Sequence, residues 1–279
     1  MCGGLRVQFR RAGSGPALVL VHGLLGYSFS WRSVIPILAC QREVFALDMP
    51  GAGFSECRSD LDCRLTGAAH RLLSFLYAAG IQSCDLVGSS YGGATATLLA
   101  AMIPSRIRSL VLVSPANPWS KIGRKRLAAL RNPVVSLLFP PVARAVRPLH
   151  GYFVRRMWGD PRRITPETLR GYALPLVRPG VFEHAIRIVR TWQGDMEDLR
   201  AALPRLASIP TLLVWGSRDR VVDPASAEVL KQQIPGAQIA IMQGAGHLPY
   251  EESPEEFCRI LQKFLSRQEL SSTLVPHER

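Results

Sequence analysis

The segment Gly88-Ser89-Ser90-Tyr91-Gly92 matches the pattern Gly-x-Ser-x-Gly, with a serine at its centre. An apolar run precedes it and a helical pattern follows from Gly93, which is the context of a nucleophilic serine. The turn there is so tight that residues two before and two after the serine must be small, which explains Gly88 and Gly92. The Ser90 hydroxyl would stand at a helix N-terminus, where the dipole favours developing negative charge. The alternative is a glycine-rich turn that closes a helix against a strand.

A serine hydroxyl needs a base at neutral pH. His247 lies in a short loop, Gly244-Ala-Gly-His-Leu-Pro-Tyr250, directly after the last expected strand. A loop at the carboxyl end of a parallel strand can reach the Ser90 site, so we expect His247 to be the base. The alternative is a loop histidine that caps the next helix. The remaining histidines are His22, His70, His150, His184 and His277. Of these, His150 and His184 are the rivals for the role of base.

The base needs a carboxylate to orient it. Asp219 follows the expected strand that ends in Trp215, and we expect it to take this role. Asp223 is the local rival, but the pair Asp223-Pro224 favours an N-cap with proline at the first helical position. A second location for the carboxylate, after the strand at 109–113, reads Ser114-Pro-Ala-Asn117 and holds none.

The reaction also needs donors for a tetrahedral oxyanion. One donor would be the backbone N–H of Tyr91, the residue after the nucleophile. The other would come from the loop Val21-His-Gly-Leu-Leu-Gly26, where the N–H of Leu24 is the natural candidate. His22 would then be structural and would hold this loop through hydrogen bonds.

Short apolar runs supply the strands that must position these groups. They lie at 17–21, 43–47, 84–88, 109–113 and 211–215, with a further candidate at 238–242. The runs are nearly continuous rather than alternating, as in parallel strands covered on both faces. Helical patterns separate them, at 65–79, 92–102 and 225–233. This alternation predicts an α/β fold with an open parallel sheet.

The alternation stops between Pro115 and about Pro210, where prolines, arginines and helical patterns such as 181–192 replace strands. We therefore expect residues 1–114 and 206–268 to form one α/β core, and residues 115–205 to form a helical insertion. The insertion would lie over the carboxyl ends of the strands, where open α/β sheets bind ligands. The polar segment 269–279 is expected to be a flexible tail.

These features together resemble the α/β-hydrolase family, in particular a serine esterase-like member with a helical cap. The chain order Ser90, Asp219, His247 is the order of that family. The matching segments run from about Leu5 to Phe264 outside the insertion, and they are His22-Gly23, Asp48-Met-Pro-Gly51-Ala-Gly53-Phe-Ser55, Gly88–Gly93, Trp215–Asp219 and Gly246–Phe257. By the resemblance, Asp48 braces the loop near the active site and is not catalytic.

Departures from the family pattern narrow the chemistry that the resemblance implies. Members that open epoxides or remove halides use an aspartate nucleophile, and Ser90 argues against both. Leu25 also stands where epoxide hydrolases usually have proline. Members that cleave carbon–carbon bonds of ring-fission products often have Asn before the nucleophile and Trp after the histidine, where this chain has Ser89 and Leu248. The first strand of the family fold, near residues 5–11, is expected to be short or missing.

Positive charge is concentrated in the insertion. The chain carries 34 Lys and Arg and 21 Asp and Glu, a net charge of +13. Between residues 115 and 180 there are 13 Lys and Arg and two acids, so this stretch has a net charge of +11. A solvated basic surface is the simplest interpretation. The alternatives are an acidic carrier protein, as in family members that cleave methyl esters of carrier-bound chains, and an anionic lipid surface. Arg155 and Arg156 would take part in either, and 134–141 with Tyr152-Phe153 would provide apolar contacts to lipid.

The rest of the sequence argues against a metal-binding protein, a secreted protein and a membrane-spanning protein. The six cysteines form no CxxC pair or metal-like cluster with histidine, so we expect reduced thiols, no metal, no cofactor and a cytoplasmic protein. The N-terminal residues lack a signal-peptide pattern, and no apolar run reaches the ~18 residues of a membrane span. No nucleic acid partner is expected, and the protein would be a monomer or dimer.

The sequence therefore predicts a hydrolase that cleaves a small-molecule carboxylic ester through an acyl-enzyme intermediate, with Ser90, Asp219 and His247 as its triad. Two other functions remain open. One is a carbon–carbon bond hydrolase of ring-fission products. The other is a ligand receptor of the same fold that retains the triad.

Overall fold

The computed structural model describes residues 2–273, apart from the side chains of residues 124, 126, 269 and 271–273. Within them, seven strands form one sheet in the order β1-β3-β2-β4-β5-β6-β7. The strands are β1 (Phe9–Ala12), β2 (Ala17–Val21), β3 (Glu43–Leu47), β4 (Cys84–Ser89), β5 (Ile107–Val113), β6 (Thr211–Gly216) and β7 (Gln238–Met242). All neighbouring pairs are parallel except β1 and β3.

Each apolar run that predicted a strand forms one, within two residues of the expected bounds. The runs are continuous because both faces of the sheet are covered. Val19 and Val21 of β2 point into one buried cluster, and Leu18 and Leu20 point into another on the opposite face. The first strand, expected to be short or missing, is present as the four-residue edge strand β1.

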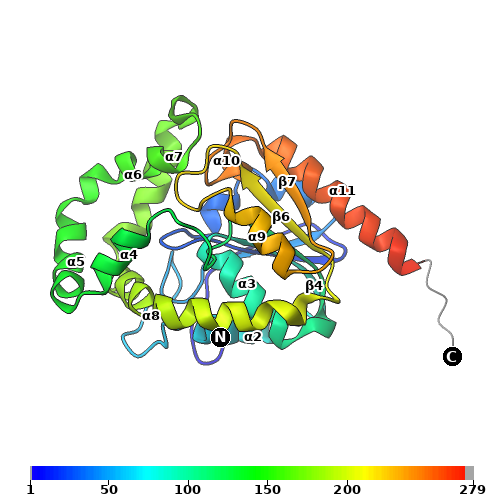
Figure 1. The fold of residues 1–279 in the computed structure, drawn as a ribbon, viewed down its shortest axis with the longest axis horizontal. Coiled ribbons are helices and arrows are strands. Elements are labelled where there is room, and N and C mark those ends of the chain that lie inside the picture. Colours follow the sequence, from blue (N-terminus) through cyan, green and yellow to red (C-terminus); the bar gives the residue numbers. More distant parts are fainter. Residues whose placement is uncertain (1, 274–279) are drawn as a thin grey trace.

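Helices cover the two faces of this sheet (Figure 1). The helices are α1 (Ile35–Leu38), α2 (Leu65–Ala78), α3 (Tyr91–Met102), α4 (Arg124–Arg131), α5 (Pro133–Ala145), α6 (His150–Met157), α7 (Pro166–Ala173), α8 (Val181–Ala202), α9 (Ser226–Gln233), α10 (Pro249–Glu252) and α11 (Pro254–Thr273). Helices α2, α3 and α8 contribute to the buried cluster on one face, while α1 and α11 contribute to the cluster on the other.

The segment between β5 and β6 is helical and contains no strand in the described structure, as the loss of the strand pattern after Val113 predicted. It holds α4 to α8. Figure 1 shows α4, α5, α6 and α7 to one side of the sheet, whereas α8 runs back beside α2 and α3. Helix α8 is longer than the expected 181–192, because the pattern of buried side chains continues through Met196 and Leu199.

The C-terminal helix α11 extends to Thr273, past residue 268 where the flexible tail was expected to begin. Residues 274–279 of that expected tail lie outside the described residues. Among residues 2–273, no helix is both long enough and apolar enough to cross a membrane.

Candidate active site

Ser90 occupies a strained turn between β4 and α3, with a backbone φ of 54°. The flanking glycines are required by close backbone contacts. A Cβ at Gly88 would lie 2.4 Å from the carbonyl oxygen of Gly92, and a Cβ at Gly92 would lie 2.3 Å from that of His22. Both distances are shorter than any side-chain carbon tolerates. The sharp turn therefore sets Ser90 at the N-terminus of α3, where the sequence placed it.

His247 and Asp219 meet beyond the carboxyl ends of β6 and β7. The Nδ1 atom of His247 lies 2.9 Å from Oδ2 of Asp219, and both side chains are buried. The other carboxylate oxygen, Oδ1, accepts hydrogen bonds from the backbone N–H groups of Val221 (2.8 Å) and Val222 (3.0 Å). Burial acts to raise the pKa of Asp219, but the charge and hydrogen bond of His247 and these two N–H groups outweigh it, so the pKa lies below its ordinary value. Asp219 is thereby kept ionised beside the histidine.

Of the rival groups, His150 lines the same cavity as Ser90 and His247, but each rival has other hydrogen-bond partners. The Asp223 carboxylate accepts a hydrogen bond from the N–H of Ala225 at 3.1 Å. Pro224 was predicted to be the first residue of α9. That prediction is wrong, because the helix begins at Ser226 and Pro224 belongs to the preceding turn. His150 contacts the carbonyl oxygen of Leu169 through Nε2. His70 contacts that of Thr66, His184 contacts the Sγ atom of Cys63, and His277 lies outside the described residues.

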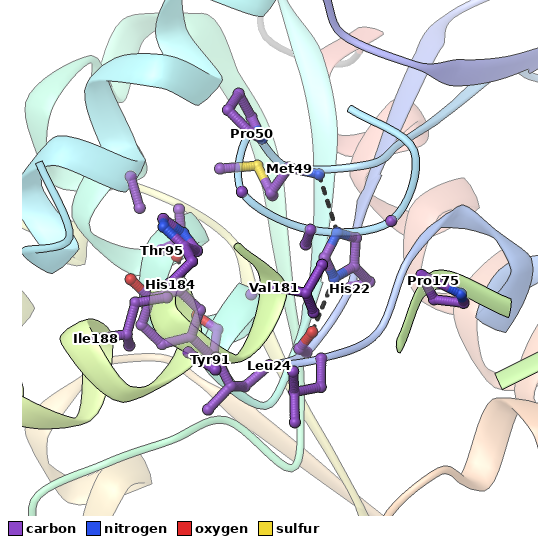
Figure 2. Close-up of a pocket in the computed structure, with 18 of the residues that line it drawn as sticks. His22, Leu24, Met49, Pro50, Tyr91, Thr95, Pro175, Val181, His184 and Ile188 are labelled. Atoms are coloured by element: carbon purple, nitrogen blue, oxygen red, sulfur yellow. Dashed lines mark hydrogen bonds between the residues drawn. The ribbon is translucent and has the colours of Figure 1, made fainter. Parts of the chain in front are cut away.

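The loop that follows β2 lies against the nucleophile. A Cβ at Gly23 would lie 3.1 Å from the Cβ of Ser90. His22 fixes this loop as expected: its Nδ1 lies 2.7 Å from the carbonyl oxygen of Gly23, and its Nε2 accepts the N–H of Met49 at 2.9 Å. Figure 2 shows the ring between these two partners. Burial lowers the pKa of His22, which favours the neutral ring that this pattern of bonds requires.

Asp48 braces the neighbouring loop in the way that the resemblance implied. Its Oδ1 accepts the N–H of Ser28 and its Oδ2 accepts the N–H of Phe54, both at 2.8 Å. The carboxylate is fully buried, and these N–H groups supply the hydrogen bonds that a buried charge needs. Asp48 therefore holds two backbone segments together through its two carboxylate oxygens.

A cavity of about 540 Å³ connects these groups, and Ser90, His247 and Leu24 all line it. The rest of its wall is mostly apolar and comes largely from the inserted helices, including Phe139, Ala143, Val146, Phe153, Met157, Leu176 and Phe182. Tyr91, the second expected oxyanion donor, begins α3 beside Ser90. Among the described residues, no group of His, Cys, Asp or Glu side chains is arranged to hold a metal ion.

The loop at 22–25 also lines a second, much smaller cavity (Figure 2). Its volume of about 30 Å³ is roughly that of one water molecule, too small for an acyl chain. His184 and Tyr91 line it. Burial, together with the charges of Arg71 and Arg187, lowers the pKa of His184 to about 4. His184 is therefore a neutral buried histidine between α8 and the core, and it does not reach the large cavity.

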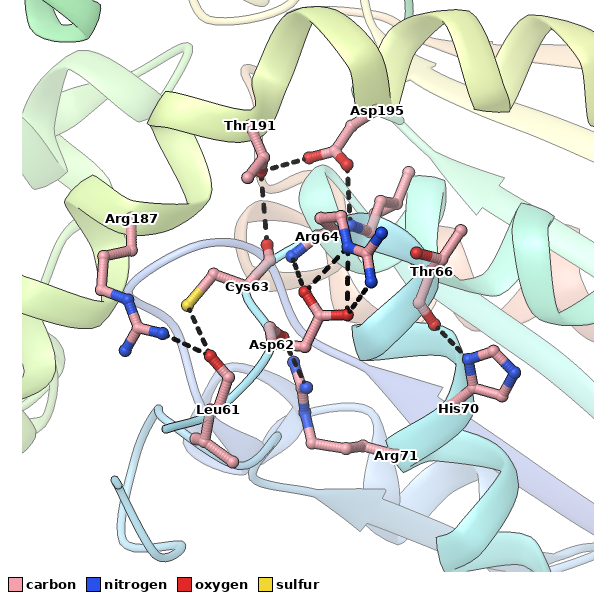
Figure 3. A network of polar contacts seen from close by, with 11 residues as sticks. Leu61, Asp62, Cys63, Arg64, Thr66, His70, Arg71, Arg187, Thr191 and Asp195 are labelled. Atoms are coloured by element: carbon pink, nitrogen blue, oxygen red, sulfur yellow. Dashed lines mark hydrogen bonds and ion pairs between the residues drawn. The ribbon is translucent and has the colours of Figure 1, made fainter. Parts of the chain in front are cut away.

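Helix α8 forms part of the cavity wall and is fixed to the core by a polar network (Figure 3). Asp195 accepts the backbone N–H of Leu65 at 2.9 Å and the hydroxyl of Thr191 at 2.7 Å. One turn earlier, the guanidinium of Arg187 donates to the carbonyl oxygens of Ser59 and Leu61. These bonds hold α8 against the segment that leads into α2, so this part of the wall has a fixed position.

Glu252 organises the histidine loop, a role that the sequence analysis missed. Its buried carboxylate accepts the N–H of Gly246 at 2.6 Å and the N–H of Gly159 at 2.9 Å. The N–H of His247 also donates to the carbonyl oxygen of Met157 at 2.6 Å. The loop of the base is therefore tied to the end of α6. In the sequence, Glu252 is visible only as part of the acidic pair Glu251-Glu252 that follows His247-Leu-Pro-Tyr. That pair does not indicate which backbone groups Glu252 binds.

The sequence of this chain is similar to those of known hydrolases. The model of the "Alpha/beta hydrolase family" matches residues 18–260. A pimeloyl-[acyl-carrier protein] methyl ester esterase of Aeromonas hydrophila is 27% identical over 94% of this chain and 100% of its own. Monoacylglycerol lipase abhd6-A of Xenopus laevis is 26% identical over 96% of this chain and 80% of its own.

A solved structure described as a membrane phospholipase A, a bacterial virulence factor, is 27% identical to this chain. It superposes with a TM-score of 0.80 over 96% of this chain and 84% of its own. The family match covers six of the seven strands, the serine turn and the loops that carry Asp219 and His247. The chain therefore belongs to the alpha/beta hydrolase family.

Proposed function

We propose that this protein is a serine hydrolase that cleaves carboxylic esters through an acyl-enzyme intermediate. One observation carries the proposal: Ser90 and His247 line the same apolar cavity, and His247 is hydrogen-bonded to the buried carboxylate of Asp219. The relatives named as an esterase and a lipase support a hydrolase of esters.

In the first half of the reaction, the Oγ atom of Ser90 attacks the ester carbonyl carbon. Because Nδ1 of His247 binds Asp219, the other ring nitrogen, Nε2, is free of a proton and takes the one from the serine hydroxyl. His247 then returns this proton to the alkoxide leaving group as the carbon–oxygen bond breaks. The alcohol departs, and the acyl group remains on Ser90.

In the second half, water attacks the acyl group and His247 removes one of its protons. The carbon–oxygen bond to Ser90 breaks, His247 protonates Oγ, and the carboxylic acid leaves. Asp219 stabilises the charged imidazolium in both halves without accepting its proton. No redox step or cofactor is needed to balance this sequence.

The negative oxygen of each tetrahedral intermediate needs donors, and we assign them to the backbone N–H groups of Leu24 and Tyr91. Tyr91 is the first residue of α3, so its N–H has no partner within the helix and faces away from it. Leu24 lies in the loop that His22 fixes beside Ser90. Preorganised donors of this kind typically contribute about 3 kcal/mol each to the transition state.

A panel of p-nitrophenyl esters of increasing acyl length tests the proposal. We expect repeated turnover, with a preference for apolar acyl groups that matches the cavity wall. A single slow turnover, accompanied by a ligand-induced shift in melting temperature, would instead indicate a receptor. Faster decay of a coloured ring-fission dienoate than of any ester would indicate a carbon–carbon bond hydrolase.

A further inference from the structure

Helix α5 has an unusual surface for a helix that meets water. Its sequence, Pro-Val-Val-Ser-Leu-Leu-Phe-Pro-Pro-Val-Ala-Arg-Ala, is apolar on nearly every side. One side is covered, because Ser136 and Pro140 are buried. On that side the ring of Phe139 packs against the ring of Phe182 in α8, with 6.4 Å between the ring centroids. A helix that is apolar all round is normally covered on all sides. The outer side of α5 therefore indicates a surface that another apolar medium covers.

The outer side of α5 continues onto α6. Among the described residues, 18 large apolar side chains are exposed, and nine of them fall within the 20 positions from 134 to 153. We call these nine the apolar patch: Val134, Val135, Leu137, Leu138, Val142, Val146, Leu149, Tyr152 and Phe153. The most exposed is Leu137, at 77%. Contiguous apolar surface of this kind marks an interaction site.

Positive charge accompanies the patch. Residues 121–159 contain nine Lys and Arg, and the sequence of this stretch contains no Asp or Glu. Arg131, Arg147, Arg155 and Arg156 are exposed along it. Arg144 is also exposed and pairs with Glu183 of α8. The surface thus combines apolar side chains with cations, which is the composition of an interfacial membrane-binding segment.

The patch is continuous with the cavity at Ser90. Val142, Val146 and Phe153 are 54%, 38% and 56% exposed, yet each also lines the cavity. These three side chains therefore form the boundary between the outer surface and the apolar interior. An acyl chain that leaves a lipid layer at this surface would pass from one apolar environment to another without crossing water.

We propose that the apolar patch and its arginines dock this protein on an anionic lipid bilayer, and that the acyl chain of a lipid ester enters the cavity there. The second half of this inference rests on the proposed ester hydrolysis. A second copy of the chain fits the surface poorly, since it would bring the exposed arginines Arg131, Arg147, Arg155 and Arg156 against the same four. A bilayer offers both anionic headgroups for the arginines and an apolar layer for the leucines.

Flotation with vesicles tests the docking. We expect the protein to bind vesicles of phosphatidylcholine and phosphatidylglycerol more than about tenfold more strongly than vesicles of phosphatidylcholine alone. The double variant Leu137→Asp, Leu138→Asp should lose at least about tenfold of this binding, because it removes apolar contact and adds repulsion. Neither leucine lines the cavity, so turnover of a water-soluble short-chain ester should stay unchanged.

The matched control is Leu270→Asp, which makes the same change at a 65% exposed leucine of α11, at the opposite end of the molecule from α5 (Figure 1). It should bind vesicles as the wild type does. Equal binding by the wild type and the double variant, or no preference for phosphatidylglycerol, would overturn the docking. So would capture of an acidic acyl carrier protein by the patch in place of vesicles.

The two halves of the inference fail separately. If the protein binds vesicles through the patch but hydrolyses neither soluble nor vesicle-borne esters, the docking is supported and the proposed function is wrong. Ester hydrolysis in solution without vesicle binding would keep the proposed function and reject the docking. When both hold, the double variant should lose turnover of phosphatidylglycerol in vesicles by at least about tenfold while its soluble-ester turnover is intact.

Discussion

The His247 ring is held by Asp219 at 2.9 Å, and the second oxygen of the same carboxylate is occupied by two backbone N–H groups. Because all three bonds need an acceptor, an amide at position 219 can satisfy them only in part. We expect Asp219→Asn to lower kcat for a p-nitrophenyl ester about 10²- to 10⁴-fold, since the wrong tautomer of His247 would be favoured. Steady-state kinetics check this.

The matched control for that variant is Asp223→Asn. Asp223 lies four residues later and its carboxylate accepts a backbone N–H in a turn. Its replacement should change kcat less than about threefold. Comparable losses in the two variants would contradict the assignment of Asp219 as the orienting acid.

The glycine that follows the nucleophile turn should be intolerant of a side chain. In Gly92→Ala, the new Cβ would lie 2.3 Å from the carbonyl oxygen of His22, so the turn or the β2 loop must move. We expect a loss of about 2 kcal/mol or more in the free energy of unfolding. Gly194→Ala, in open space on α8, should instead gain about 0.5–1 kcal/mol. Urea unfolding measures both, and equal effects would contradict the close packing at the turn.

Cavity size should set acyl-length preference. Ala143 lines the cavity from α5, and Ala143→Phe would fill part of its about 540 Å³. We expect kcat/KM for a long-chain p-nitrophenyl ester to fall about tenfold or more, while that for the acetate changes little. Ala145→Phe, two residues on and exposed, is the control and should leave the profile unchanged. An unaltered profile in Ala143→Phe would place the acyl group elsewhere.

His184 should make the protein less stable in mild acid. Its pKa in the folded state is about 4, below the ordinary value of 6.5, so the unfolded chain binds the proton more readily between these values. The contribution is complete above about pH 6.5 and is lost as the pH falls toward 4. This one group should cost on the order of 2 kcal/mol of unfolding free energy between about pH 7 and pH 5.

The comparison is with His184→Asn, which does not titrate. Its unfolding free energy, measured by urea at the same two pH values, should fall by about 2 kcal/mol less than that of the wild type. A parallel decline in both proteins would show that other groups carry the acid sensitivity.

The strands and the reactive groups were predictable because each left a local signal. The buried strand formed by Thr211–Gly216 is an uninterrupted apolar run in the sequence. Ser90 lies in a Gly-x-Ser-x-Gly pentapeptide, in which Gly88 is required by a contact within the turn and Gly92 by a contact with the loop after β2. Asp219 and His247 each follow such a run. Their meeting then follows from the parallel sheet, since the carboxyl ends of its strands lie at one edge.

One feature that depends on a distant partner was missed from the sequence, and two helix ends were misjudged. Glu252 binds Gly159, which lies 93 residues away, and nothing near Glu252 indicates that contact. The length of α8 was underestimated because Gly194 weakens the helical pattern, although the helix passes through it and buries Met196 beyond. The start of α9 was also misplaced, since the Asp223 carboxylate caps a turn before the helix.

The central claim is that Ser90 is the nucleophile, and the most direct measurement compares two neighbouring serines. Ser90→Ala should lower kcat for a p-nitrophenyl ester by about 10³-fold or more, and should abolish the mass increase that a fluorophosphonate produces on the wild-type protein. Ser89→Ala, at the buried residue before it, should retain both the labelling and most of the turnover. Undiminished turnover or labelling in Ser90→Ala would contradict the account.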